Sequence, residues 1–174
     1  MRKCSQICFV TGKPQCGKTS FLCDIVEHAR TLNLSLGGFI AIGLWQDNRR
    51  SGFILEELAS GVQTPLSGRS ATSREMGGYV FYPEGFAAGL RTLQPQALQN
   101  KDLITVDEVG WLETRGDGWA KALPHLTETG VKQIWVVRDA MIPEVCATWD
   151  FEPCLVVNPD DPNAKLQVLK WLKP

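Results

Sequence analysis

Residues 7–19 read ICFVTGKPQCGKT, an apolar run that ends in a loop containing two glycines. The run at 7–11 is rich in β-forming residues and predicts a short strand. After the loop, apolar side chains recur at steps of three and four, which predicts a helix over residues 18–32. A strand, a glycine-bearing loop and a helix in this order are typical of a phosphate-binding loop, so this stretch decides the fold class.

The loop fits the pattern G-x-x-x-x-G-K-[ST] over residues 12–19. Its backbone N–H groups and the positive end of the helix dipole form a cradle for anions. We expect Lys18 to act in catalysis by neutralising the β- and γ-phosphates of a nucleotide, and the hydroxyl of Thr19 to bind Mg²⁺. The expected nucleotide-binding residues are Gly12, Lys13, Pro14, Gln15, Cys16, Gly17, Lys18, Thr19 and Ser20.

A second apolar run, residues 103–106, is followed directly by Asp107 and Glu108. An apolar strand that delivers a carboxylate at its carboxyl end is a Walker B pattern, the usual companion of a phosphate-binding loop. Asp107 is expected to hold Mg²⁺, usually through water, and Glu108 to act in catalysis by orienting or activating the attacking water.

The rest of the chain alternates strand-like and helix-like segments. Residues 38–45, 51–58 and 62–66 are strand-like runs that predict an antiparallel β-ribbon, and the polar composition of 67–78 predicts an exposed loop. The remaining expected elements are strands at 79–82, 103–106, 133–137 and 154–157 and helices at about 84–98, 119–129, 143–148 and 163–172. This order predicts an α/β fold of the three-layer P-loop NTPase type, with a mostly parallel sheet and an added antiparallel β-ribbon.

Composition places the chain among globular proteins. A length of 174 residues with 44% hydrophobic and 21% charged side chains predicts a single domain over residues 1–174. The net charge of -1 argues against nucleic acid and anionic membranes as partners, although it leaves a local basic groove open. No apolar run approaches the roughly 18 residues of a spanning helix, and the amino terminus lacks signal-peptide features, so we expect a cytoplasmic protein. The sequence identifies no protein partner.

The segment Asp107-Glu108-Val109-Gly110-Trp111-Leu112-Glu113 resembles the Asp-Glu-Ile-Gly-x-x-Glu signature of the THEP1 family of small nucleoside-triphosphatases. The pairs Gly38-Phe39 and Gly52-Phe53 and the segment 79–86 are also similar to that family, and the likeness extends from the loop to about Arg138. The resemblance implies a RecA-like P-loop fold and Mg²⁺-dependent hydrolysis of ATP, GTP and other nucleoside triphosphates.

One departure from the family lies in the phosphate loop. Many members have a Pro-Gly-x-Gly-Lys-Thr loop, whereas Gln15 occupies the position of the first of these glycines here. The substitution keeps the Walker A pattern, but it restricts the loop or places a side chain over the phosphates, so we expect altered turnover.

Charge on a transferring phosphoryl group usually requires an arginine in addition to the loop lysine. The candidates are Arg69, Arg74, Arg115 and Arg138. We choose Arg138 as the third catalytic residue because it follows a predicted parallel strand, at the sheet edge where ligands collect. Trp111 and Trp119 flank the Walker B loop, where either could contact a nucleotide base or a partner, whereas Trp135 and Trp171 are expected in the core.

Three activities fit these motifs. The first is a nucleoside-triphosphatase that releases a diphosphate and phosphate. The second is a small-molecule or nucleotide kinase of the same superfold, in which Glu108 and the 67–78 loop serve an acceptor. The third is a non-catalytic nucleotide-binding regulator that presents the β-ribbon to a partner.

Overall fold

The computed structural model describes residues 3–70 and 78–173. Within them, an eight-stranded sheet has the strand order β10-β2-β8-β7-β3-β4-β5-β6, and a separate pair joins β1 to β9. The strands of the large sheet are β2 (Ile7–Val10), β3 (Leu36–Gln46), β4 (Arg49–Glu57), β5 (Gln63–Arg69), β6 (Tyr79–Phe81), β7 (Leu103–Val109), β8 (Lys132–Val137) and β10 (Leu155–Val157). The small pair consists of β1 (Lys3–Cys4) and β9 (Phe151–Glu152).

The large sheet has a parallel half and an antiparallel half. Strands β10, β2, β8, β7 and β3 pair in parallel, and β3, β4, β5 and β6 pair antiparallel. The long strand β3 belongs to both halves, because its first residues pair with β7 and most of its length pairs with β4. The predicted α/β class, with a mostly parallel core and an added β-ribbon, is therefore confirmed.

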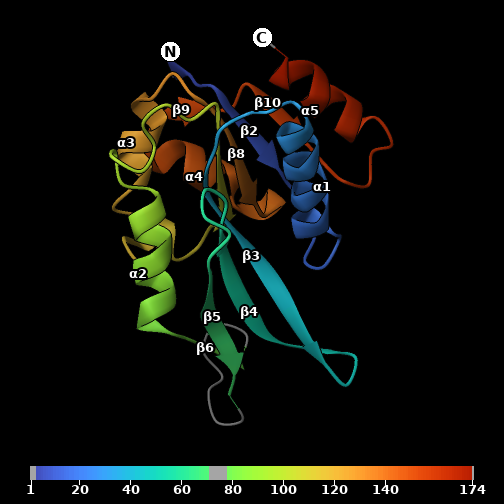
Figure 1. Cartoon of the computed structure of the whole chain (residues 1–174), viewed down its shortest axis with the longest axis vertical. Coiled ribbons are helices and arrows are strands. Elements are labelled where there is room, and N and C mark those ends of the chain that lie inside the picture. Colours follow the sequence, from blue (N-terminus) through green and yellow to red (C-terminus); the bar gives the residue numbers. More distant parts are fainter. Residues whose placement is uncertain (1–2, 71–77, 174) are drawn as a thin grey trace.

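Helices cover both faces of the parallel half (Figure 1). On one face lie α1 (Lys18–Thr31) and α5 (Ala164–Leu172), which bury a core that includes Leu22, Ile25 and Val168. On the other face lie α3 (Leu123–Glu128) and α4 (Ile142–Thr148), whereas α2 (Pro83–Thr92) packs against β3, β4 and β5. Their core includes the ring cluster of Phe9, Trp135 and Phe151. The three-layer arrangement places the carboxyl ends of the parallel strands at one shared edge.

The antiparallel ribbon extends away from this edge (Figure 1). Asp47 and Asn48 join β3 to β4 with φ values of 49° and 59°. Two central residues with positive φ form the tight hairpin turn whose twist matches the flanking strands. Strand β5 then continues to Arg69 and buries Ser67, so the prediction of an exposed loop from residue 67 is wrong for its first residues. The polar composition of residues 67–69 gave no sign that the strand continues through them. The rest of the predicted loop, residues 71–77, lies outside the described residues.

Two predicted helices are shorter than expected because each meets a proline. Helix α2 ends at Thr92 rather than near residue 98, just before Pro95. Helix α3 begins at Leu123 rather than at residue 119, with Pro124 in its first turn. Proline lacks the backbone N–H and clashes with the preceding turn, so it is favoured at a helix start and excluded from the interior.

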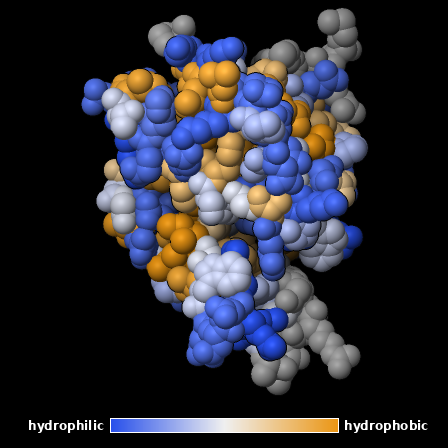
Figure 2. Space-filling model, turned by 90° about the vertical axis from the view of Figure 1, so that its right-hand side faces the viewer, coloured by the Kyte–Doolittle hydropathy of each residue, from blue (hydrophilic) through white to orange (hydrophobic). Residues whose placement is uncertain are grey.

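The pairing of β1 with β9 was not predicted, because two-residue strands carry no readable periodicity. Among the described residues, no helix combines the length and apolar character needed to cross a membrane. Figure 2 shows hydrophilic side chains over most of the visible face, with apolar side chains in small groups.

Gly38 lies opposite Thr105, where β3 pairs with β7. It has a φ of +80°, and a Cβ atom built on it would lie 2.0 Å from the carbonyl oxygen of Thr105. We therefore expect Gly38→Ala to lower the free energy of unfolding by about 3 kcal/mol or more, since strain and a backbone clash act together. Urea denaturation measures this value.

Gly61→Ala is the matched control, because Gly61 has a φ of +72° and no atom within 4 Å of the added Cβ. It should cost only about 1 kcal/mol, the strain of a left-handed alanine. Equal losses in the two variants would show that the approach to Thr105 is unimportant.

Candidate active site

The phosphate loop connects β2 to α1 at the carboxyl edge of the sheet. The Thr11 N–H donates to the Val157 carbonyl at 2.8 Å, which fixes the loop against β10, and the Phe21 N–H donates to the Gly17 carbonyl at 2.9 Å, which opens the helix. The first four N–H groups of a helix have no acceptor within it, so those of Gly17 to Ser20 are available to an anion. Lys13, Pro14 and Gln15 are exposed at the crest of the loop.

Lys18 folds back over this loop. Its Nζ donates to the carbonyl oxygens of Gly12 at 3.0 Å and Lys13 at 2.6 Å. The ammonium group therefore lies at the mouth of the cradle formed by the backbone N–H groups. A cation at this position would attract an anion held in the cradle.

Gln15 adopts a left-handed backbone conformation with a φ of 62°. An L-residue with a Cβ atom costs about 1–2 kcal/mol in this region, whereas glycine adopts it freely. Many THEP1 proteins therefore have glycine at the position of Gln15, where the backbone conformation of this chain favours glycine. The departure at Gln15 adds backbone strain to the loop and places an exposed side chain at its crest.

A neighbour of the loop went unrecognised in the sequence. Asn158 follows β10, and its Oδ1 lies 3.1 Å from the place of a Cβ atom on Gly12. That oxygen also accepts a hydrogen bond from the Asp160 N–H at 3.0 Å, which holds the side chain against the loop. Nothing in a run of Asn, Pro and Asp distinguished Asn158 from an ordinary turn residue, because its role depends on β10 pairing with β2.

Asp107 is fully buried beside the first turn of α1. Its Oδ2 accepts hydrogen bonds from the Thr19 hydroxyl at 3.2 Å and from the Ala41 N–H at 3.0 Å. Its Oδ1 is buried without a hydrogen-bond partner among the described residues. Burial, with a smaller contribution from the charge of Glu108, raises the pKa of Asp107 to about 7. An unpartnered carboxylate oxygen beside a threonine hydroxyl fits a divalent cation.

Asp107 and Glu108 lie together in a β-bulge of β7. Val106 pairs with Trp135 and Val109 with Val137, so two residues of β7 oppose one of β8. Glu108 itself has a φ of 62° and is exposed, whereas Asp107 points into the protein. Bulges redirect side chains next to active sites, and backbone strain of this kind concentrates there. The bulge gives two consecutive carboxylates different environments.

The three candidate arginines that the structure describes lie in separate parts of the molecule. Arg138 is exposed directly after β8, which lies between β2 and β7, so it follows the strand between the loop and the Asp107–Glu108 pair. Arg69 lies in the β-ribbon, and Arg115 stacks on the ring of Trp111, with 4.0 Å from its Cζ to the ring centroid. Arg74 lies outside the described residues.

The two tryptophans near the Walker B strand differ sharply. Trp119 is 2% exposed, and its ring packs on Phe39 at 4.6 Å and on Phe86 at 5.1 Å between centroids. The expectation that Trp119 could contact a nucleotide base is therefore wrong. Trp111 is 50% exposed and keeps a free ring face.

A family model described as NTPase matches residues 7–152, which includes the loop and the carboxylate pair. The chain belongs to this NTPase family. Among its curated relatives, the nucleoside-triphosphatase THEP1 of Archaeoglobus fulgidus is 32% identical over 117 residues, which cover 67% of this chain and 68% of that protein. The THEP1 protein of Methanocaldococcus jannaschii is 26% identical over 122 residues, 70% of this chain and 71% of that protein.

Two solved structures share the fold of this NTPase. THEP1 from Aquifex aeolicus superposes with a TM-score of 0.71 at 20% identity, covering 97% of this chain and 99% of that one. A human cancer-related nucleoside triphosphatase has a TM-score of 0.69 at 21% identity, covering 98% of this chain and 95% of that one. The predicted family and fold are thus confirmed, and the chain is a nucleoside-triphosphatase.

Glu113 is the last residue of the family signature and a buried carboxylate of this NTPase. It is 3% exposed, and it accepts hydrogen bonds from the Gly110 N–H at 2.9 Å and the Trp119 N–H at 3.2 Å. It therefore closes the loop that leaves the Walker B strand. Burial raises the pKa of Glu113 to about 7, and the charge of Glu108 contributes in the same direction.

This raised pKa predicts a pH-dependent stability. The folded protein holds the Glu113 proton more tightly than the unfolded chain does, so the stabilisation is complete below about pH 4.5 and is lost as the pH rises through 7. Its size is roughly 3 kcal/mol at 1.36 kcal/mol per pKa unit. Compared with the parent, Glu113→Gln should lose this part of the pH dependence, so its free energy of unfolding should fall less between pH 5 and pH 8. Urea denaturation at these two pH values measures the difference.

Glu84→Gln is the control, because Glu84 is an exposed carboxylate on α2. It should leave the parent's pH dependence unchanged. Since Asp107 has a similarly raised pKa, part of the dependence should persist in Glu113→Gln. A pH profile of Glu113→Gln parallel to that of the parent would contradict the assignment.

Proposed function

We propose that this NTPase is Mg²⁺-dependent and hydrolyses ATP, GTP and other nucleoside triphosphates to the diphosphate and phosphate. The observation that carries the proposal is the buried Asp107 carboxylate, which accepts from the Thr19 hydroxyl and keeps its Oδ1 without a partner among the described residues. A buried anion of this kind needs a cation. The cytoplasmic location expected from the sequence remains a prediction.

The triphosphate binds in the cradle of residues 12–20. The N–H groups at the start of α1 and the helix dipole attract the phosphate oxygens. Lys18 exchanges its contacts with the Gly12 and Lys13 carbonyls for contacts with the β- and γ-phosphates. These contacts involve the phosphates alone, which supports acceptance of more than one base.

Thr19 and Asp107 hold the metal ion. Their oxygens are the hard ligands that Mg²⁺ prefers, and Asp107 acts through water or directly by Oδ1. Mg²⁺ held by these two residues would neutralise negative charge that develops on the triphosphate. A metal ion held there would favour the ionised form of Asp107, whose pKa is raised by burial.

Glu108 positions the nucleophile and Arg138 stabilises charge. The exposed Glu108 carboxylate orients a water molecule and accepts its proton as the water oxygen attacks the γ-phosphorus. The bond from the γ-phosphorus to the bridging oxygen breaks, and its electron pair leaves with the nucleoside diphosphate. Arg138, after the strand between β2 and β7, supplies positive charge to the equatorial oxygens.

The test of this function is phosphate release by purified protein with ATP, GTP, CTP or UTP, with Mg²⁺ or with EDTA. We expect steady release that needs Mg²⁺ but no added alcohol, nucleoside or nucleotide acceptor, because Glu108 orients water. Lys18→Ala should fold but lose binding and turnover, which excludes a contaminating phosphatase. A stimulation of several orders of magnitude by one acceptor, with a phosphorylated product, would identify a kinase instead, and binding without turnover would identify a regulator.

Neutralising Glu108 and neutralising Asp107 should produce different defects. Glu108→Gln should leave nucleotide and Mg²⁺ binding close to normal and slow hydrolysis by roughly 10²-fold or more, the usual contribution of a positioned base. Asp107→Asn should raise the Mg²⁺ concentration for half-maximal activity by about 10-fold to 100-fold, as for other groups around a bound metal. Mg²⁺ titrations of turnover and nucleotide binding distinguish these outcomes, and identical binding defects would show that the roles are misassigned.

A further inference from the structure

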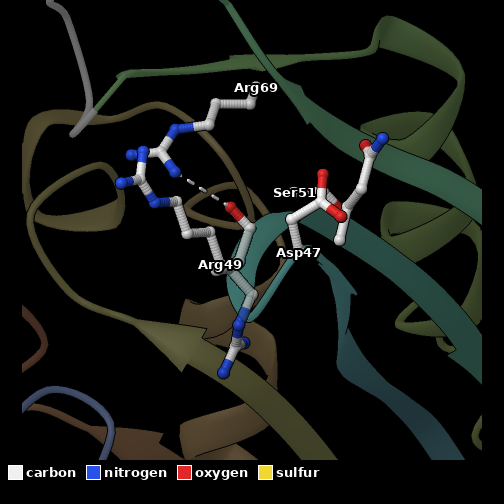
Figure 3. A pocket seen from close by; sticks show the side chains of 6 residues that line it. Asp47, Arg49, Ser51 and Arg69 are labelled. Carbon is white, nitrogen blue, oxygen red and sulfur yellow. Dashed lines mark hydrogen bonds between the residues drawn. The ribbon is translucent and has the colours of Figure 1, made fainter.

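A basic concavity of about 530 Å³ lies at the tip of the β-ribbon, where β3 turns into β4 and β5 ends (Figure 3). Its lining residues are Gln46, Asp47, Arg49, Arg50, Ser51 and Arg69. Figure 3 shows the side chains of Arg49 and Arg69 directed toward one another from different strands. Two positive charges thus converge on one small part of the surface.

Within residues 3–70 and 78–173, none of Arg49, Arg50 and Arg69 forms an ion pair with a carboxylate. Arg69 donates to the Arg50 carbonyl at 3.5 Å, and Asp47 directs its carboxylate away from the two guanidinium groups (Figure 3). Like charges that converge without a counterion repel one another, so an anion bound between them would stabilise the tip.

An exposed aromatic ring lies beside Arg50, one of the residues that line the concavity. Trp45 is 58% exposed at the end of β3, and the Arg50 Cζ lies 4.4 Å from its ring centroid. Arg50 covers one face of the ring and also lies 5.1 Å from the centroid of Phe53, which fixes it by cation–π contacts. The free part of the Trp45 ring is a platform on which a flat apolar group can stack.

We propose that the ribbon tip, defined as Trp45, Arg49, Arg50 and Arg69, binds single-stranded nucleic acid. Arg49 and Arg69 contact backbone phosphates and Trp45 stacks on a base, the combination that proteins use for single strands without sequence preference. Gln46, Asp47, Arg49 and Arg69 are all exposed, so the concavity is too open to enclose a small ligand as most small-molecule pockets do. A flexible strand can follow such an open surface and contact several side chains in turn.

The ribbon tip is separate from the nucleotide site. Ala41 of β3 contacts Asp107, and Gln46 lies five residues further along the same strand, about 17 Å away at 3.3 Å per residue. A nucleotide held by the phosphate loop therefore leaves the tip free. The net charge of -1 excluded a broad basic surface, but this site requires only a local one.

The experiment measures binding of a fluorescently labelled 20-nucleotide oligo(dT) and oligo(U) by anisotropy, between 50 and 200 mM salt. With two or more phosphate contacts, affinity should fall by about sevenfold or more over this range. Arg49→Gln/Arg69→Gln should bind at least tenfold more weakly and flatten the slope of log affinity against log salt by about 1.4. Trp45→Ala should weaken binding by about fivefold or more, the usual loss for one stacked base.

The control is Arg30→Gln/Arg91→Gln, which removes the same charge from arginines that are ion-paired to Glu27 and Glu57. It should bind as the parent does, and so should Lys18→Ala. Equal weakening in the control, or loss of binding in Lys18→Ala, would overturn the ribbon tip as the site. Lys18→Ala lacks the phosphate-loop lysine that would bind tripolyphosphate, so equally tight binding of inorganic tripolyphosphate by this variant would overturn the assignment to nucleic acid. Full affinity in Trp45→Ala would overturn it too. Circular dichroism and melting curves confirm that each variant is folded.

Discussion

The buried carboxylate of Asp107 is the constraint around which the site is built. It joins three segments that are distant in sequence, because its Oδ2 accepts from Thr19 on α1 and from the Ala41 N–H on β3 while Asp107 itself lies on β7. A charged group without solvent requires such partners, and the raised pKa of Asp107 reflects how incompletely they compensate for burial. The Oδ1 atom has no hydrogen-bond partner among the described residues, and a bound cation would compensate for its burial.

Two residues with strained backbone conformations lie on the same edge of the sheet. Gln15 at the crest of the phosphate loop and Glu108 in the bulge of β7 both have left-handed conformations, each at a cost of about 1–2 kcal/mol. The buried parallel strands on either side provide the packing that sustains this cost, with side chains such as Phe9, Val106 and Trp135 fully inaccessible. The packed core thus supports the strained backbone at this edge of the sheet. There the consecutive residues Asp107 and Glu108 have different environments, one buried and the other exposed.

Strand β3 connects the two functional regions that we propose. Its early part pairs with β7 and supplies the Ala41 N–H to Asp107, and its end carries Trp45 into the ribbon tip. The parallel half of the sheet is covered by helices on both faces, whereas the ribbon extends beyond them (Figure 1). Edges and protruding hairpins expose backbone and side chains to partners, so a surface of unpaired arginines at this place is consistent with binding.

The sequence by itself determined the phosphate loop, the Walker B pair and the α/β class, because each depends on contiguous residues or on local periodicity. It also contained the reason that two helices are short, in Pro95 and Pro124, although apolar spacing across those prolines suggested longer ones. Only the tertiary structure decided that Trp119 is buried, that Asn158 contacts the loop, and that Arg49 and Arg69 converge. Those relations depend on which strands pair, and pairing joins residues whose separation in the chain leaves no local signal.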